Sequence, residues 1–418
     1  MAERGYLARC ADGELERLLK TAGAVVVEGP KACGKTETAR RVAASEVLLD
    51  VDQSARAAVA VDAALVLDGP TPRLIDEWQV EPQVWNQVRR AVDERGEPGQ
   101  FILAGSAVPA DDATRHTGAG RFSRLRLRPM SLAESGASDG AISLARLLAG
   151  EKAQARDPGL RVNDLAEEIA RGGWPGFRGL PLEPALQSVR DYLEEICRTD
   201  ISQVDGVRRD PERVRRLVRS LAHNVATYAA LTTLARDAEG EGRLDEHTAG
   251  QYLSALERLF IVENQPAWEP HLRSRYVLRK SAKRHLVDPS LAVAALEATP
   301  EALLRDLNLF GFLFESLTVR DLRVYAQASG ARVKQYRDNS GLEVDAIVEG
   351  GASWAAFEIK LGGERAIDEA AANLRKFAQQ VDTERTGAPA ALAVIVGAGY
   401  GYVREDGVQV VPIGTLGP

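Results

Sequence analysis

The segment from residue 25 to residue 36 constrains the fold more than any other part of the chain. An apolar run, Val25–Val27, leads to Gly29, and four residues separate that glycine from Gly34-Lys35-Thr36. This is the G-x-x-x-x-G-K-T spacing of a phosphate-binding loop, with a buried strand expected before it and a helix over 36–44 after it. The alternative is an ordinary glycine turn between a strand and a helix. We favour the phosphate loop because strand, loop and helix all occur in the order that it requires.

The motif assigns a role to its individual side chains. Backbone N–H groups and the positive end of the helix dipole surround phosphate oxygens in such a loop. Lys35 would reach the β- and γ-phosphates, and the Thr36 hydroxyl would ligate Mg²⁺. The predicted cofactors are therefore ATP and Mg²⁺. The predicted nucleotide-binding residues are Gly29, Pro30, Lys31, Ala32, Cys33, Gly34, Lys35, Thr36 and Glu37.

Apolar segments alternate with helical ones through the first 140 residues. Strands are expected at 25–27, 47–51, 74–77 and 101–106, with helices at 14–20 and 83–94. This alternation predicts a parallel sheet that is covered by helices on both faces. Ligands of such sheets bind beyond the carboxyl ends of the strands, where these motifs fall.

Two of the predicted strands end in residues suited to hydrolysis. The third ends in Asp76-Glu77, and the fourth ends in Ser106. Asp76 would hold Mg²⁺, and Glu77 would polarise the attacking water. Ser106 would sense the γ-phosphate, although an ordinary strand-end turn explains it equally well.

An arginine-rich segment follows at 120–129. The alternation from Arg124 to Leu127 predicts an edge strand with its arginines on one face. Arg121 or Arg124 would meet the γ-phosphate, in cis or from a neighbouring subunit of a homo-oligomer, and stabilise transition-state charge. The alternative is a solvated basic strand.

The middle of the chain is predominantly helical. We expect an amphipathic helical stretch over 141–170, a turn at Gly172-Gly173-Trp174-Pro175-Gly176 and a helix over 182–198. Together these residues would form a small helical lid.

From about residue 207 the chain becomes locally basic. Helices are expected near 208–221, at 226–237 and at 247–260, followed by a strand at 260–262 and a basic segment at 277–287. Three helices followed by a basic two-stranded turn is the winged-helix plan, in which a helix enters the DNA major groove and the wing contacts the backbone. A helical packing or protein-interaction module is the alternative. The basic residues are Arg208, Arg209, Arg213, Arg215, Arg216, Arg219, Arg279, Lys280, Lys283 and Arg284.

The last segment carries a second set of acidic residues. Helices are expected at 309–322 and 367–381, and strands at 324–325, 333–337, 342–348, 354–360, 391–396 and 408–412. Period-2 geometry puts Glu358 and Lys360 on one face of a strand, where Asp345 and the helix residue Glu315 can meet them. The three carboxylates would hold Mg²⁺ for phosphodiester cleavage, and Lys360 would steer or deprotonate water. The alternative is a set of surface polar positions on a half-buried sheet.

Length and composition bound these predictions. The chain has 418 residues, a net charge of −7 and three separated cysteines. Its length predicts several domains, for which we expect the ranges 1–140, 141–200, 201–300 and 301–418. The charge excludes a chain that is basic overall, and the cysteines fit a reducing cytoplasm. No apolar run approaches the ~18 residues of a membrane span, so we expect no membrane partner.

These motifs, in this order, resemble a prokaryotic family of AAA-type P-loop ATPases fused to a C-terminal domain of unknown function whose core looks like the PD-(D/E)XK nucleases. The likeness covers nearly the whole chain. Lys31 stands where the family loop usually has Arg, and His285 stands where its basic hairpin has an aromatic residue. The stretches that carry the resemblance are 29–36, 74–79, 104–106, 120–131, 172–175, 280–288, 311–315, 343–345 and 358–360.

The resemblance implies an α/β fold with four parts: a P-loop parallel-sheet ATPase domain, a small helical lid, a winged-helix-like module and a nuclease-like domain. Two functional hypotheses follow. In the first, an ATPase controls a DNA-binding C-terminal half that also cleaves DNA if its acidic site is active. In the second, an ATP-dependent switch acts through protein–protein interaction, and the nuclease-like part is an inactive scaffold.

Overall fold

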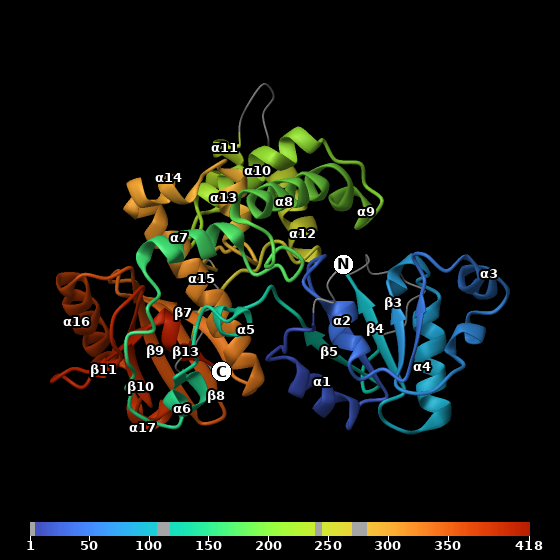
Figure 1. Cartoon of the computed structure of the whole chain (residues 1–418), viewed down its shortest axis with the longest axis horizontal. Coiled ribbons are helices and arrows are strands. Elements are labelled where there is room, and N and C mark those ends of the chain that lie inside the picture. The colour runs from blue at the N-terminus through green and yellow to red at the C-terminus, as the bar shows by residue number, and fades with distance from the viewer. Residues whose placement is uncertain (1–4, 107–117, 239–244, 270–281) are drawn as a thin grey trace. The chain divides into compact units, whose positions relative to one another are not determined.

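The computed structural model describes residues 5–106, 118–238, 245–269 and 282–418 (Figure 1). The chain divides into two compact units. Unit 1 comprises Met1–Pro129, Thr199–Arg208 and Ala255–Ile261, and unit 2 comprises Met130–Arg198, Arg209–Ser254 and Val262–Pro418. This division differs from the four consecutive domains expected from the sequence, because unit 1 includes two short segments from later in the chain.

Unit 1 is built on a five-stranded sheet in the order β2-β3-β4-β1-β5. Every adjacent pair of strands is parallel, as predicted. The edge position of β5 also agrees with the prediction. The strands are β1 (Ala24–Glu28), β2 (Ser45–Leu48), β3 (Arg73–Asp76), β4 (Phe101–Gly105) and β5 (Phe122–Arg126).

Helices cover both faces of this sheet, because side chains alternate along each strand. On β1, Ala24 and Val26 pack into one apolar core with Trp85 of α4. Val25 and Val27 pack into a second core with Leu15 of α1. The helical elements are α1 (Asp12–Leu19), α2 (Lys35–Arg40), α3 (Gln53–Val61) and α4 (Val84–Arg95), with 3₁₀ turns at Ala63–Leu67 and Trp78–Val80. The helix predicted to reach residue 44 is therefore shorter, since α2 ends at Arg40.

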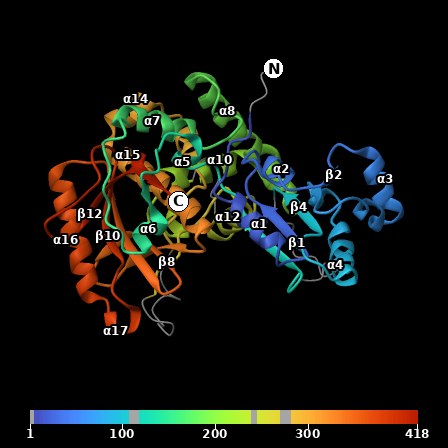
Figure 2. The ribbon, with the colours of Figure 1, turned by 60° about the horizontal axis from the view of Figure 1, so that its bottom comes forward.

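Unit 2 contains a six-stranded sheet in the order β11-β12-β10-β9-β8-β7. The β7–β8 and β8–β9 pairs are antiparallel, whereas β9–β10 and β10–β12 are parallel. Two helices, α15 (Leu307–Ala328) and α16 (Glu364–Gln380), pack against the sheet, and α16 lies beside β10 in Figure 2. The strands are β7 (Arg332–Arg337), β8 (Glu343–Gly350), β9 (Ser353–Lys360), β10 (Ala391–Val396), β11 (Tyr402–Val403) and β12 (Gln409–Pro412).

The strand predicted at 324–325 is wrong, because these residues lie within α15. Every residue of this helix from Leu313 to Ala326 is buried, so its apolar residues show no clear helical period. The Tyr325 hydroxyl accepts a hydrogen bond from the Ala133 backbone N–H at 3.2 Å. Tertiary burial thus overrides the local strand preference of a Val-Tyr pair.

The continuous helical stretch predicted over 141–170 is also wrong. Residues Ile142–Ser143 form β6, which pairs in parallel with β13 (Leu416–Gly417). Helices α6 (Leu144–Leu148) and α7 (Val162–Arg171) are separated by a non-helical connection that contains Gly150 and Pro158-Gly159. Glycine and proline disfavour a helix interior, which explains the interruption.

The remaining helices include the three predicted in the basic region. Helix α8 (Leu182–Glu195) continues into a π-helical turn (Ile196–Asp200) and α9 (Ile201–Gln203). Three later helices, α10 (Pro211–His223), α11 (Leu231–Asp237) and α12 (Glu246–Arg258), precede α13 (Ser290–Ala295) and α14 (Pro300–Arg305). The short helices are α5 (Leu132–Ser135), α17 (Thr383–Thr386) and the 3₁₀ turn Ile413–Thr415.

Isolated antiparallel bridges join the connection between α10 and α11, and the residues after α12, to residues 283–286. They join Thr227 to Arg284, Val262 to Leu286 and Gln265 to Lys283. This order of helices and bridges is compatible with the predicted winged-helix plan, which stays a prediction. Arg279 and Lys280 of the predicted basic turn lie outside the described residues. Within the described ranges, no helix is long and apolar enough to cross a membrane.

Candidate functional site

The loop between β1 and α2 has the backbone that tight phosphate binding requires. Gly34 adopts a φ of 102°, which side-chain-bearing residues rarely adopt. At Gly29 an added Cβ would lie only 2.1 Å from the Leu127 carbonyl oxygen. Glycine is therefore required at both ends of the loop, at Gly34 for its backbone conformation and at Gly29 because a side chain has no space.

The Lys35 ammonium lies inside the loop that is predicted to bind phosphate. Its Nζ donates hydrogen bonds to the carbonyl oxygens of Gly29 at 3.1 Å and Pro30 at 2.8 Å. The side chain is buried. The Lys35 ammonium therefore lies at the N-terminus of α2. The ammonium and the positive end of the helix dipole both favour binding of an anion such as phosphate.

Thr36 and Asp76 meet at the carboxyl end of the sheet. The Thr36 hydroxyl donates to Asp76 Oδ2 at 2.9 Å. The other carboxylate oxygen, Oδ1, is buried and has no hydrogen-bond partner among the described residues. Burial raises the pKa of Asp76. A hydroxyl beside a carboxylate with an unsatisfied oxygen fits Mg²⁺, which takes one or two protein oxygens and keeps waters and phosphate oxygens as its other ligands.

Glu77 lies beside the two polar residues at the end of the neighbouring strand. It has a left-handed backbone with a φ of 50°. Its Oε2 accepts hydrogen bonds from Gln79 Nε2 and from the Ser106 hydroxyl, the latter at 3.3 Å. The sequence motif includes Gln79, but its contact with Glu77 was not predicted. The structure thus brings Glu77, Gln79 and Ser106 into one cluster beside Asp76.

Lys31 contacts a residue that is distant in sequence. Its Nζ donates to Asp200 Oδ1 at 2.5 Å, and Asp200 lies in the π-helical turn after α8. Both residues belong to unit 1. Sequence reasoning missed Asp200 because no local pattern links it to the phosphate loop. Glu37, also predicted to bind nucleotide, pairs with Arg40 at 2.6 Å on the exposed face of α2.

A second long-range contact, made by Arg9, holds the backbone of the loop in place. The buried Arg9 guanidinium donates to the Cys33 carbonyl at 2.8 Å and to the Arg128 carbonyl at 2.7 Å. Cys33 is itself buried, and its thiol donates to the Leu127 carbonyl at 3.6 Å. Cys33 therefore fills space beneath the loop, and Arg9 is a positioning residue that the sequence did not reveal.

The two candidate arginines lie at different places: Arg121 lies away from the phosphate loop, whereas Arg124 contacts the residue that precedes the loop. Arg121 pairs with Asp93 at 2.8 Å and precedes Phe122, which is aligned with the first residue of β1. It therefore lies at the amino end of the parallel strands, whereas Asp76 ends its strand at the carboxyl end. Arg124 pairs with Glu28 at 2.8 Å. A role for either arginine in trans stays a prediction.

The four predicted residues of the C-terminal cluster converge. Lys360 Nζ donates to Glu358 Oε2 at 2.8 Å and to Asp345 Oδ2 at 3.1 Å. Asn373 of α16 donates to the other Glu358 oxygen at 2.7 Å. Lys283, predicted as part of a DNA-contacting wing, instead lies buried between Glu315 and Asp345. Sequence reasoning thus found the acids but missed the second lysine and the amide.

The charges of this cluster are strongly coupled. Burial raises the pKa of Glu315 to about 8. Burial and the charge of Asp345 raise the pKa of Glu358 to about 7. Burial alone would raise the pKa of Asp345 too, but Lys283 and Lys360 lower it below its usual range. In the described ranges, no group of three or more His, Cys, Asp or Glu side chains is placed to hold a metal ion.

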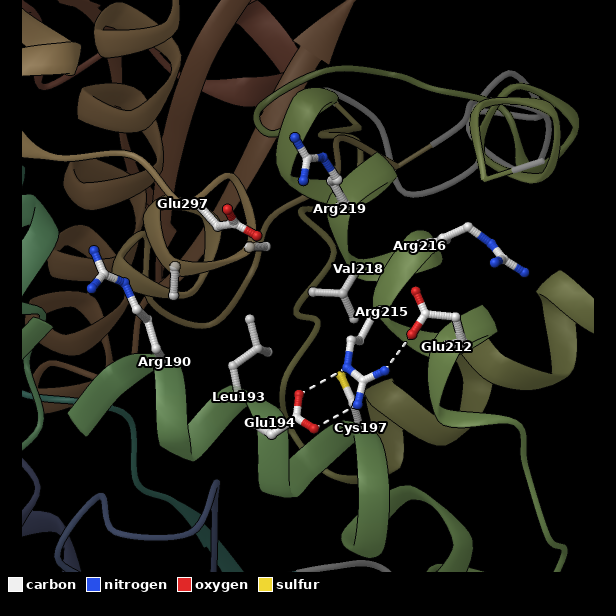
Figure 3. Close-up of a pocket in the computed structure, with 12 residues that line it drawn as sticks. Arg190, Leu193, Glu194, Cys197, Glu212, Arg215, Arg216, Val218, Arg219 and Glu297 are labelled. Carbon is white, nitrogen blue, oxygen red and sulfur yellow. Dashed lines mark hydrogen bonds and ion pairs between the residues drawn. The ribbon is translucent and has the colours of Figure 1, made fainter. Parts of the chain in front are cut away.

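Acidic neighbours partly neutralise the arginines of α10, three of which, Arg215, Arg216 and Arg219, line a cavity of about 420 Å³ (Figure 3). Arg215 pairs with Glu194 and Glu212, each at 2.5 Å. Arg213 lies 3.6 Å from Asp210, and Arg209 is buried. The basic run therefore presents less free positive charge than its sequence suggests.

Comparisons with known proteins agree with a nucleotide-binding first unit. Residues 21–136 match the family described as "AAA domain". Residues 162–302 and 310–416 match two families described as domains of unknown function, DUF8612 and DUF4143.

Similar whole proteins are known from mycobacteria. Uncharacterized proteins of Mycobacterium bovis and Mycobacterium tuberculosis are each 27% identical over 361 residues, covering 84% of this chain and 73% of theirs. A solved structure, the Walker-type ATPase PABY2304 of Pyrococcus abyssi, has 14% identity and a TM-score of 0.42, covering 68% of this chain and 94% of that one.

The family match and the geometry of the loop point to one conclusion. The AAA match covers the phosphate loop and the residues at the carboxyl ends of β3 and β4. Residues 21–136 are therefore similar to an AAA domain, and the match together with the loop geometry supports a P-loop ATPase.

Proposed function

We propose that this chain is a Mg²⁺-dependent ATPase whose nucleotide state controls its C-terminal half. The observation that carries the hydrolytic part is the Thr36–Asp76 contact with its unsatisfied Oδ1, next to Glu77 and the Lys35 loop. A protein that binds a nucleotide without hydrolysing it would not need a second acid, Glu77, beside Asp76.

Each residue of the site would perform one task. Lys35 would exchange its two loop carbonyls for β- and γ-phosphate oxygens, which compensates the phosphates' charge. Thr36 and Asp76 would hold Mg²⁺, which when bound neutralises charge developing on the phosphates. Glu77 would orient the attacking water and accept its proton as a general base, while Gln79 and Ser106 hold the Glu77 carboxylate in place.

The proposal is tested by ATP turnover in the full-length protein with and without Mg²⁺. Lys35→Ala should abolish ATP binding, and Asp76→Asn should retain nucleotide binding in the absence of metal but lose turnover. Turnover that persists at the wild-type rate in either variant would refute this assignment. A thermal melt of each variant shows whether it is folded.

We propose DNA as the first candidate for what the C-terminal half engages. The order of helices and bridges after α10 supports a winged-helix-like module, to which the bridges at Val262 and Gln265 contribute. The position of Arg121 at the amino end of the strands, where it pairs with Asp93, supports a homo-oligomer in which this arginine would act in trans.

The second candidate is a protein-interaction switch with an inactive nuclease-like scaffold. Two observations favour it: acidic neighbours pair with the arginines of α10, and lysines occupy the carboxylate cluster. Both reduce the charge that phosphate contacts or metal-dependent cleavage would need.

DNA titrations at two salt concentrations separate the two candidates. Phosphate contacts predict an affinity that falls steeply as salt rises. DNA binding at low salt that is lost at high salt, and ATP turnover that changes on DNA addition, would support the first candidate. Absence of binding at low salt would reject it and favour the switch.

A further inference from the structure

A lysine fills the centre of the acidic cluster in unit 2. The Lys283 side chain is only 4% exposed, and its Nζ forms ion pairs with Glu315 and, at 3.2 Å, with Asp345. The two acids come from different elements, α15 and β8. The ammonium therefore occupies the space between them, where the predicted cleavage site would require a metal ion.

The backbone around Lys283 is anchored to the same sheet. Lys283 and Gln265 exchange backbone hydrogen bonds of 2.8 and 3.1 Å. The Gln265 side chain donates to the Asp345 carbonyl at 2.9 Å and to the Lys334 carbonyl at 3.0 Å. The position of the ammonium is thus built into the fold and does not depend on the rotamer of a free surface lysine.

Charge balance explains why the ammonium and a divalent cation would exclude each other. With all three acids ionised, two lysines leave the cluster one excess negative charge. Without Lys283 the excess is two, which a single divalent cation would neutralise. Mg²⁺ or Mn²⁺ would also need carboxylate oxygens at roughly 2.0–2.2 Å, a distance that leaves no room for a buried ammonium between the same oxygens.

A cavity adjoins two members of the cluster, Glu358 and Lys360. This cavity, of about 280 Å³, is lined by Glu358, Lys360, Asn373 and residues of α16. The Lys360 side chain is 35% exposed. A cation could therefore reach Glu358 from solvent, while the ammonium of Lys283 occupies the space between Glu315 and Asp345.

We infer that Lys283 stands in for the divalent cation of this cluster, and that a metal ion binds Asp345 only when Lys283 is removed. The inference rests on the proposed function for the identity of the output half, and it states which group occupies the centre of that half's acidic cluster.

The test measures binding of Mn²⁺ alone to the full chain without nucleotide, by calorimetry and by the metal-dependent shift in Tm. Four proteins are compared: wild type, Asp345→Asn, Lys283→Met, and the double variant. Methionine keeps the length and apolar stem of the lysine. We expect wild type and Asp345→Asn to bind Mn²⁺ alike. Lys283→Met should gain one equivalent and a metal-dependent rise in Tm, both lost in the double variant.

Two results would overturn the inference. One is a wild-type Mn²⁺ site that Asp345→Asn removes, and the other is a folded Lys283→Met protein with no gained site. If Lys283→Met does not fold, the comparison of wild type with Asp345→Asn still decides the first point. ATP turnover measured on the same wild-type preparation is independent, so a failure of the proposed ATPase function would be distinguished from a failure of this inference.

Discussion

Replacement of Glu77 by Gln should separate hydrolysis from nucleotide binding. Both hydrogen bonds described for the Glu77 carboxylate go to Oε2, from Gln79 and Ser106. The amide oxygen of the variant side chain can still accept from these donors, so the local structure should persist. The amide cannot act as a base, and it therefore loses the ability to take a proton from the attacking water.

The size of the effect follows from this single lost role. General-base catalysis contributes about 10²–10⁴ in rate. At about 1.4 kcal/mol for each tenfold change, the loss corresponds to roughly 3–5 kcal/mol of transition-state stabilisation. Ser106→Ala removes only one long hydrogen bond to the same carboxylate. It should cost about 1 kcal/mol, or a few-fold to tenfold in kcat, because it disorders Glu77 without removing it.

The assay is steady-state phosphate release at saturating ATP and Mg²⁺, with ATP affinity measured separately at equilibrium. Glu46→Gln is a matched control, since Glu46 is an exposed acid that pairs with Arg40 away from this cluster. We expect normal turnover for the control and normal ATP affinity for all three variants. A Glu77→Gln kcat within about threefold of wild type would refute the assignment of Glu77 as the base.

Three further predictions concern contacts that the structure revealed. Arg320→Met would leave the fully buried carboxylates of Asp288 and Asp321 without their ion pair. We expect this to cost about 3–5 kcal/mol of folding stability and to lower Tm by on the order of 10 °C. Arg365→Met, at an exposed position, should leave Tm unchanged in the same melts. Asp200→Asn should remove the ion pair with Lys31 and leave that ammonium free to contact phosphate. Because a half-exposed ion pair is worth up to ~1 kcal/mol, ATP binding should become about two- to fivefold tighter. Unchanged or weaker ATP binding would contradict this prediction. Burial lowers the pKa of His285 well below its ordinary value, so only the unfolded chain takes up its proton as pH falls below about 6.5. Denaturant titrations should therefore show that wild type loses about 1 kcal/mol more stability than His285→Gln between about pH 7 and pH 5.5, and equal losses would exclude a neutral buried imidazole.

Much of the first unit could be predicted because its signals are local. A strand, a glycine-rich loop and a helix follow one another within 20 residues, and Asp76-Glu77 ends a neighbouring apolar strand. Period-2 alternation likewise predicted that Glu358 and Lys360 share a face with Asp345. The errors in secondary structure arose where burial hid the period, as in α15, or where glycine and proline interrupt an apolar pattern after Leu148.

Packing between distant segments completes each site. Local patterns were enough to predict the phosphate loop, the oxygens proposed to hold Mg²⁺ and the three acids of the C-terminal cluster, because periodicity and backbone requirements act over a few residues. Only the folded chain brings Asp200 to Lys31, keeps Arg121 at the opposite end of the strands, and inserts Lys283 between Glu315 and Asp345. These pairings depend on how segments far apart in sequence pack, and the long-range electrostatics that result are absent from any local pattern.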